Sequence, residues 1–285
     1  MIPETSDLRI FVAVAEAGNI SRAADTLNYS QSNITGRIKL MEDRLGVALF
    51  IRLNRGVTLT ASGRLLLDYA VRILALTGEA ERMLMEKEAP SGTLVLGSLE
   101  TAAAVRLPRI LSAYHQRFPQ VDLQVITGTS DELMQHLLEY RVDAAFISGN
   151  VDHPSLAAIP VFQEELVLVT VKGTSIENCK RTLIVFRRGC SYRAKFESWL
   201  RDSGYLPYRV MEFGTVDGIL GCLKAGMGMT VLPRAVFKDD PELSIHELPA
   251  HVAQVDTMLV SRRDVVQTKA MTEFCQIVQD HSVQR

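Results

Sequence analysis

The sequence predicts an α/β protein in two parts, a small N-terminal part and a larger part in which strands and helices alternate. In the first 60 residues, amphipathic helices are followed by a hairpin-like run. From Thr93 onward, short apolar strands alternate with helices, which is typical of an open α/β sheet. A chain of 285 residues with 47% apolar and 22% charged residues is long enough and apolar enough for two globular domains.

The first two helices form a compact pair in the sequence. In Asp7–Gly18, apolar residues recur at i, i+3, i+4 and i+7 from Leu8, and the glycine is expected to end the helix. Ser21 is expected to cap a second helix, Arg22–Leu27. Only two residues then separate it from the next helix, so the pattern is that of two helices joined by a tight turn.

The stretch from Ser30 to Gly46 predicts a third helix with a usable outer face. Ser30 is a suitable N-cap and Gly46 a suitable stop. The apolar stripe of this helix consists of Ile34, Ile38, Met41 and Leu45. Small polar residues near its N-terminus, followed by cations, suit a DNA major groove, because amides and hydroxyls reach base edges and cations bind phosphates. The alternative is a polar face that only meets water.

A β-hairpin is expected at Leu49–Thr60, with a turn at 54–56 and with Arg52 and Arg55 near its tip. Together these elements predict a winged helix-turn-helix. Between Gly18 and Thr60 there are six cations and three anions, and a net charge of only +3 favours binding as a dimer. The residues that we expect to contact DNA are Ser21, Arg22, Gln31, Ser32, Asn33, Thr35, Gly36, Arg37, Lys39, Arg52 and Arg55.

The first 63 residues resemble the N-terminal domain of the LysR-type transcriptional regulators. The resemblance lies in FVAVAEAGNISRAADTL, SQSNIT, IKLMEDRLGVALF and RGVTLTASG, which occur in the family's order. It implies a DNA-binding regulator that forms dimers or dimers of dimers. Two positions depart from the family pattern: Ser32 stands where proline is common, and Gly36 where arginine is common. Either DNA approaches the backbone closely at Gly36, or base recognition there differs from the common pattern.

Thr60 to Glu88 predicts one long helix, capped by Thr60 or Ser62. Its apolar residues cover much of its circumference: Leu66, Tyr69, Ala70, Ile73, Leu74, Leu76 and Ala80. The helix is therefore expected to pack against a second copy, and the resemblance implies the same dimerising role. The alternative is an ordinary core helix of the first domain. Residues 89–92 are expected to form a hinge, which gives a DNA-binding domain at 1–60, a linker at 61–90 and an effector domain at 91–285.

The effector domain is predicted from its alternation of elements. The expected strands are Thr93–Gly97, Val121–Thr127, Ala144–Ser148, Leu166–Val171, Thr182–Phe186, Arg209–Phe213, Met229–Leu232 and Asp256–Val260. The expected helices are Ala102–Phe118, Ser130–Tyr140, Tyr192–Ser203, Val216–Ala225 and Thr268–Asp280, with Ser130 or Asp131 as the cap of the second.

The runs GTLVLGS, LPRILSAYHQRFPQVDLQVITG, LLEYRVDAAFIS and LKAGMGMTVLP extend the LysR resemblance to this domain. It implies a periplasmic-binding-protein-like (type 2) fold whose effector cleft lies between two lobes, lobe I at about 91–160 and 263–285 and lobe II at about 161–262. The runs EAPSG, AAFISG and GCSYR are similar to the YofA-like subgroup of the family.

The family's cleft positions map onto the loops that follow the strands. The expected effector contacts are Ser98, Glu100, Thr101, Gly128, Thr129, Ile147, Ser148, Thr215 and Val216. Hydroxyls and N–H groups at helix N-termini bind anions well, as many family members bind small carboxylates. Glu100 does not fit such an anion site: either it points away from the cleft, which we favour, or the effector is not a simple anion.

Cys190 carries a separate hypothesis. It precedes an expected helix and lies near Arg187, Arg188 and Arg193, and both features lower the pKa of a thiol. The segment resembles the place where peroxide-sensing LysR relatives carry a reactive cysteine. Trp199 stands about where a partner cysteine would be, and Cys179 is the alternative partner. A buried, unreactive thiol is the interpretation that we prefer.

Nothing in the sequence predicts catalysis, a metal site or a cofactor. Six histidines and four cysteines show no ligand spacing, and no phosphate loop or nucleophile elbow is present. We expect no signal peptide and no membrane span, and a cytoplasmic location. The expected partners are promoter DNA, a small-molecule effector, a second copy of the chain and RNA polymerase. The alternative from another class is a soluble small-molecule-binding protein or enzyme whose N-terminal helices only mediate assembly.

Overall fold

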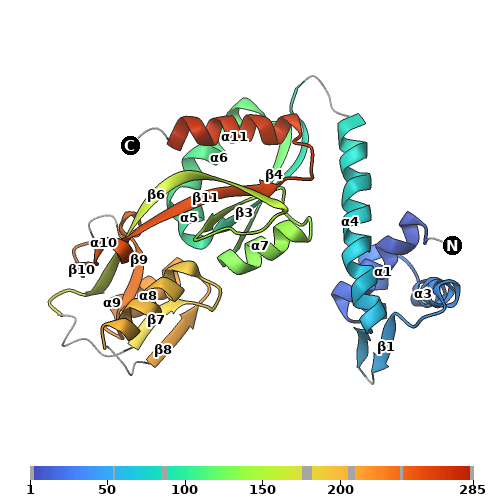
Figure 1. Cartoon of the computed structure of the whole chain (residues 1–285), viewed down its shortest axis with the longest axis horizontal. Coiled ribbons are helices and arrows are strands. Elements are labelled where there is room, and N and C mark those ends of the chain that lie inside the picture. Colours follow the sequence, from blue (N-terminus) through green and yellow to red (C-terminus); the bar gives the residue numbers. More distant parts are fainter. Residues whose placement is uncertain are drawn as a thin grey trace. The chain divides into compact units, whose positions relative to one another are not determined.

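A computed structural model describes residues 3–53, 55–84, 89–174, 182–204, 209–237 and 240–282 of the chain. The chain divides into two compact units, Met1–Met85 and Glu86–Arg285 (Figure 1). Each unit has a hydrophobic core of its own. The predicted α/β class with an N-terminal winged helix-turn-helix is confirmed.

Three helices make up most of the first unit: α1 (Thr5–Ala17), α2 (Ile20–Leu27) and α3 (Gln31–Leu45). Ser30 Oγ accepts a hydrogen bond from Asn33 N–H at 3.3 Å, which confirms this residue as the cap of α3. The expectation that Ser21 caps α2 is wrong. Asn19 does so, because its side-chain oxygen accepts from the N–H groups of Ser21 (2.9 Å) and Arg22 (3.1 Å), and the helix begins at Ile20.

The hairpin of β1 (Phe50–Leu53) and β2 (Gly56–Leu59) is antiparallel and is held against the helices at two points. Glu42 Oε1 accepts from the backbone N–H groups of Leu49 (2.7 Å) and Phe50 (3.1 Å). At the other end, Val57 N–H donates to the carbonyl of Gly18 at 2.9 Å. A side chain at Gly56 would collide with that carbonyl, so the sequence needs glycine there. Asn54, in the expected turn, lies outside the described residues.

The long helix α4 (Ala61–Leu84) completes the first unit. Thr60, one of the two expected caps, accepts a hydrogen bond from Gly63 N–H through Oγ1 at 2.9 Å. Ala70 is fully buried, and Leu66, Leu67 and Leu74 pack against the core, so one face of the helix belongs to this unit. The expected continuation to Glu88 lies outside the described residues.

The second unit has two lobes. The sheet of the first lobe is built from β3 (Gly92–Leu99), β4 (Val121–Gly128), β5 (Ala144–Ser148), β11 (Gln254–Arg262) and the first part of β6 (Leu156–Val171). Strand β3 is parallel to β4 and β5, and β11 is antiparallel to β5 and β6. The helices of this lobe are α5 (Glu100–Val105), α6 (Leu107–Arg117), α7 (Ser130–Leu138) and α11 (Lys269–Ser282).

Strand β6 runs through both lobes (Figure 1). Residues 156–165 pair with β11, and residues 166–171 pair with β9 (Thr230–Pro233) and β10 (Leu243–Glu247). A β-bulge interrupts the β6–β11 ladder next to Pro160, which has no N–H to donate. The second lobe also contains β7 (Thr182–Phe186), β8 (Arg209–Phe213), α8 (Ser191–Asp202), α9 (Val216–Lys224), the 3₁₀ turn Arg234–Val236 and α10 (Ala250–Ala253).

Three expectations about these elements are corrected. The single helix expected over 102–118 is two helices, α5 and α6, because Pro108 has no N–H for the carbonyl four residues earlier. Helix α7 is capped by Thr129 and not by Ser130 or Asp131, since Thr129 and Glu132 form a reciprocal capping box. Strand β6 begins ten residues before the expected strand, at Leu156.

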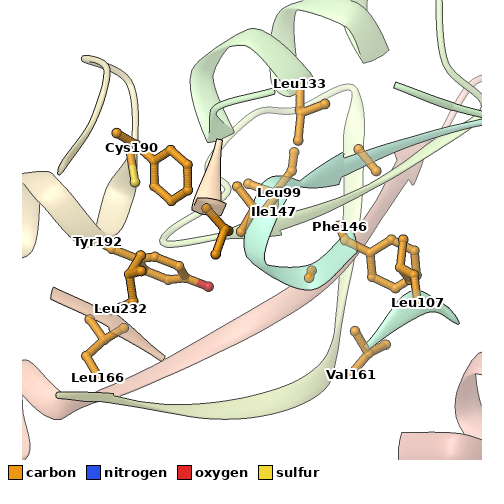
Figure 2. Close-up of a cluster of buried hydrophobic side chains, with 14 of the residues drawn as sticks. Leu99, Leu107, Leu133, Phe146, Ile147, Val161, Leu166, Cys190, Tyr192 and Leu232 are labelled. Atoms are coloured by element: carbon orange, nitrogen blue, oxygen red, sulfur yellow. The ribbon is translucent and has the colours of Figure 1, made fainter. Parts of the chain in front are cut away.

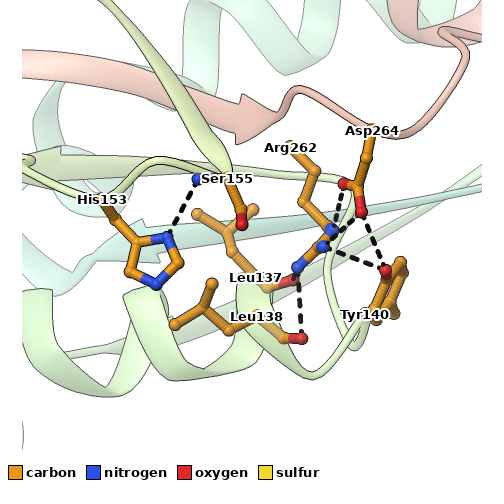
Figure 3. A network of polar contacts seen from close by, with 7 residues as sticks. All are labelled: Leu137, Leu138, Tyr140, His153, Ser155, Arg262 and Asp264. Carbon is orange, nitrogen blue, oxygen red and sulfur yellow. Dashed lines mark hydrogen bonds and ion pairs between the residues drawn. The ribbon is translucent and has the colours of Figure 1, made fainter. Parts of the chain in front are cut away.

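A polar network fixes the C-terminal end of α7 (Figure 3). The Arg262 guanidinium donates to the carbonyls of Leu137 (3.3 Å) and Leu138 (3.2 Å) and to the Tyr140 hydroxyl (2.9 Å). It also pairs with Asp264 at 2.7 Å and lies 3.8 Å from the centre of the Tyr140 ring. These contacts anchor α7 to the end of β11. Among the described residues, no helix has the length and apolar character that crossing a membrane requires.

Candidate nucleic-acid interface and ligand cavity

Helix α3 presents its polar face to solvent. Gln31, Ser32, Asn33, Gly36 and Lys39 are exposed. The opposite face is buried through Ile34, Ile38 and Met41. The exposed face is therefore available to a partner, while the buried face fixes the helix in its unit.

Thr35 and Gly36 differ in what the fold requires of them. Thr35 is half-buried, and its hydroxyl donates to the carbonyl of Gln31 at 2.8 Å. A Cβ atom placed on Gly36 would meet nothing within 4 Å. Packing inside the chain therefore gives no reason for a glycine in the middle of this helix, where it costs stability.

Arg37, which was expected to face DNA, is bound to the first helix. Its Nε lies 2.7 Å from Asp7 Oδ1, and its Nη2 donates to Ser6 Oγ at 3.0 Å. Asp7 is buried, with only 6% of its surface exposed. Arg37 therefore holds α3 against α1 in the free protein, because a buried carboxylate is costly without a partner.

The other expected DNA contacts lie at the edges of this surface. Ser21 and Arg22 are exposed at the start of α2, and Arg52 and Arg55 are exposed on the hairpin. Within the described parts of the chain, the side chains of Arg22, Arg52 and Arg55 form no ion pair like the one that holds Arg37. Exposed cations of this kind suit phosphate contacts on both sides of a helix in the major groove.

The second unit contains a cavity of about 120 Å³ between its lobes. Of the nine expected effector positions, four line it: Glu100, Thr101, Gly128 and Thr129. Glu100 thus borders the cavity, against the orientation that we favoured from the sequence. The other positions lie elsewhere. Ser98, Ile147, Ser148 and Val216 are buried outside the lining, and Thr215 caps α9 by accepting from Gly218 N–H at 3.2 Å.

Sequence reasoning missed the second-lobe side of the cavity, which includes Phe186, Arg187, Tyr192 and Phe213. Phe186 and Phe213 are register partners at the carboxyl ends of the parallel strands β7 and β8. The rule that ligands bind outside the carboxyl ends of parallel strands is the signal that would have found them.

The two lobes are joined beside the cavity. Arg187, from the second lobe, binds Glu132 of α7 through two hydrogen bonds of 3.0 and 2.7 Å. The Arg187 guanidinium is the main cause that lowers the pKa of Glu132 to about 2. The carbonyl of Gly189 also accepts from Asp131 N–H at 3.4 Å. These contacts close one side of the cavity.

Cys190 and Tyr192 line the cavity from its buried side, among the apolar side chains that Figure 2 shows. Burial raises the pKa of the Tyr192 phenol to about 12. The side-chain hydroxyls of Thr257, Thr101 and Ser148 act on the pKa of the phenol in the opposite direction, and burial has the larger effect.

The expectation of a lowered pKa at Cys190 is wrong, because burial raises the pKa of this thiol. Only 5% of the residue is exposed. Two of the three arginines that were expected to stabilise a thiolate are engaged with carboxylates, Arg187 with Glu132 and Arg193 with Glu197. Cys179, the alternative redox partner, lies outside the described residues.

Comparisons with known proteins agree across the whole chain. Residues 5–64 match the family model described as bacterial regulatory helix-turn-helix protein, lysR family, and residues 87–283 match the LysR substrate binding domain. The chain is 41% identical over 282 residues to the HTH-type transcriptional regulator GltR of Bacillus subtilis (strain 168), covering 96% of this chain and 95% of that protein. It is 38% identical over 282 residues to the HTH-type transcriptional regulator SoxR of Arthrobacter sp. (strain TE1826), covering 97% of each.

Among solved structures, CbnR, a LysR family transcriptional regulator, matches with a TM-score of 0.69 at 26% identity, covering 98% of this chain and 99% of CbnR. A second structure, with the same TM-score and identity, contains full-length CbnR with its target DNA and covers 98% of this chain and 100% of that chain.

Proposed function

Because this chain belongs to the LysR family of bacterial transcriptional regulators, we propose that it binds promoter DNA through α3 and the hairpin as a dimer or dimer of dimers. A small molecule in the cavity of the second unit would then change transcription. Its curated relatives are transcriptional regulators, so the alternative of an enzyme is set aside. Promoter DNA as the target implies a cytoplasmic protein. The YofA-like subgroup stays a prediction.

The observation that carries the DNA-binding proposal is the solvent-exposed polar face of a firmly held α3. The helix is fixed by its buried stripe, by the Arg37–Asp7 ion pair and by the hydrogen bonds that Glu42 accepts from backbone N–H groups at the start of the hairpin. A recognition helix must be held rigidly, since base-edge hydrogen bonds depend on its position. Gln31, Ser32 and Thr35 are the residues that we assign to base recognition. Arg22, Lys39, Arg52 and Arg55 are assigned to phosphates.

The outer face of α4 supports a dimer. Besides Leu84 at its end, this helix exposes four large apolar side chains: Leu65 (61%), Tyr69 (55%), Ile73 (38%) and Leu76 (50%). They follow one another at i, i+4, i+8 and i+11, which forms a single stripe on one side of the helix. A stripe of this kind is unfavourable in water, so we infer that two copies pair through it.

The cavity is the site through which we propose that a ligand controls transcription. Side chains from both lobes line it, so one ligand can contact both lobes. Such a ligand shifts the protein toward the arrangement of the lobes that binds it more tightly, by as much as its affinities for the two arrangements differ. Through α4, the change in lobe arrangement would alter how a dimer or tetramer binds DNA and contacts RNA polymerase. The redox alternative gains no support, because Cys190 is buried with a raised pKa.

Footprinting on the DNA upstream of the protein's own gene tests the function, at two salt concentrations because phosphate contacts are salt-dependent. The wild-type chain should protect an extended site with two separated half-sites. The triple variant Gln31→Ala, Ser32→Ala, Thr35→Ala should lose this protection. The control Gln116→Ala, an exposed residue on α6, should keep it. Equal protection by both variants would remove α3 from DNA recognition.

A further inference from the structure

We propose that the effector is a small organic cation, a protonated amine on a compact apolar body, bound by the Glu100 carboxylate beside Phe186 and Phe213. This inference rests on the proposed function only in taking the cavity between the lobes as the effector site.

The charge of the cavity favours a cation. Arg187 is the one cationic side chain that lines it among the described residues, and its guanidinium is held by both oxygens of Glu132. Glu100 also lines the cavity, and within the described part of the chain its carboxylate has no hydrogen bond or ion pair. Arg187 also feels the charge of Glu100, so two carboxylates share one guanidinium and the group carries one net negative charge. That charge attracts a cation and repels an anion.

One helix N-terminus at the cavity, that of α7, is not available to an anion. In α7, Glu132 N–H donates to Thr129 Oγ1 at 3.3 Å, and Thr129 N–H donates to Glu132 Oε2 at 2.9 Å. Asp131 N–H is directed to the carbonyl of Gly189. The N-terminus of this helix therefore binds the protein's own oxygens. Glu132 is also fixed by its cap contact, so it does not release Arg187 without breaking several hydrogen bonds.

Aromatic side chains give the cation a second kind of partner. Phe186 and Phe213 lie side by side at the ends of β7 and β8, and both line the cavity with Tyr192. Aromatic rings attract ammonium groups through their negative faces, most strongly where water is excluded. They also provide apolar surface for the uncharged part of the ligand.

The volume limits the size of the ligand. The cavity measures about 120 Å³. A cavity of roughly 150 Å³ holds a benzene molecule in a protein interior. The enclosed part of a ligand is therefore slightly smaller than benzene. Because the cavity is partly open to solvent, a ligand of one six-membered ring with a short amine substituent fits with part of it outside.

Three probes of nearly equal shape test the charge directly: benzylamine, benzyl alcohol and benzoate. Calorimetric titration of the full chain at neutral pH should show benzylamine binding at least about tenfold more tightly than the other two. Glu100→Gln should abolish that preference and leave benzyl alcohol binding unchanged. Asp152→Asn, which removes an exposed carboxylate away from the cavity lining, should behave like the wild type.

Several results would overturn the inference. They are tighter binding of benzoate than of benzylamine, an amine preference that survives Glu100→Gln, and no binding of benzylamine at all. Promoter footprinting on the same samples separates this failure from failure of the function. A protein that protects its promoter but ignores benzylamine keeps its function and loses this ligand class, whereas lost protection counts against the function itself.

Discussion

Replacing Gly36 by alanine should make the protein more stable and, at the same time, a poorer DNA binder. Gly36 lies inside α3, and a Cβ atom there meets nothing within 4 Å. Alanine is favoured over glycine in a helix interior by about 1 kcal/mol. For a unit of this size, that gain corresponds to a rise of about 4–8 °C in melting temperature.

The effect on DNA should have the opposite sign. Gly36 lies on the exposed face of α3 between Ser32 and Lys39, so an added methyl group would stand between the helix and the base pairs. We expect operator affinity to fall about tenfold, since a misfit of that size costs about 1–3 kcal/mol at a base-reading position. Fluorescence anisotropy with labelled operator at fixed salt measures this, and circular dichroism follows the melting.

Gly221 provides the matched control. It is also an exposed glycine inside a helix, α9, with nothing within 4 Å of a Cβ atom, but it lies in the second unit. Gly221→Ala should gain comparable helix stability and leave operator affinity unchanged. The reasoning is refuted if Gly36→Ala stabilises the protein and binds the operator as well as the wild type, because DNA then does not approach the helix at this position.

Three further predictions concern the dimer, the lobe contact and the buried thiol. The double variant Leu65→Ser, Leu76→Ser should raise the dissociation constant of the dimer roughly a thousandfold, because about half of each side chain is exposed in both copies. Sedimentation velocity measures this, and the control Leu53→Ser, which changes an exposed leucine of the hairpin, should leave the dissociation constant unchanged. Glu132 has a pKa of about 2 in the folded chain, so the stability that its charged form contributes should be lost as pH falls from about 4.5 toward 2. Glu132→Gln should flatten melting temperature against pH in that window, and an unchanged slope would contradict the role of the ion pair. Cys190 should react with iodoacetamide far more slowly than free cysteine at neutral pH until the chain is unfolded, and rapid labelling in the native protein would revive the redox hypothesis.

Local patterns in the sequence were enough to predict many elements closely. The cap at Ser30 and the strands β5, β7 and β8 match their predicted bounds, because caps and short apolar runs are local signals. The break between α5 and α6 was also readable, since Pro108 stands in the sequence at that point. It was missed because the apolar pattern continues through it.

Features that depend on distant residues could not be predicted in this way. Nothing near Arg37 indicates that its partner is Asp7, thirty positions earlier. The choice of Asn19 over Ser21 as a cap depends on backbone angles, because both residue types cap well. The cavity joins Glu100 to Arg187 and Phe213, residues that only the folding of two lobes brings together.

The passage of β6 through both lobes also restricts how such a chain can evolve. One residue inserted in β6 would move every later side chain to the opposite face and would break the pairing with β9 and β10 in one step. The ladder already contains one irregularity, the bulge beside Pro160, and it lies on the first-lobe side of the crossing. Length changes should therefore accumulate in surface loops, while the span from Leu156 to Val171 keeps a constant number of residues in functional descendants.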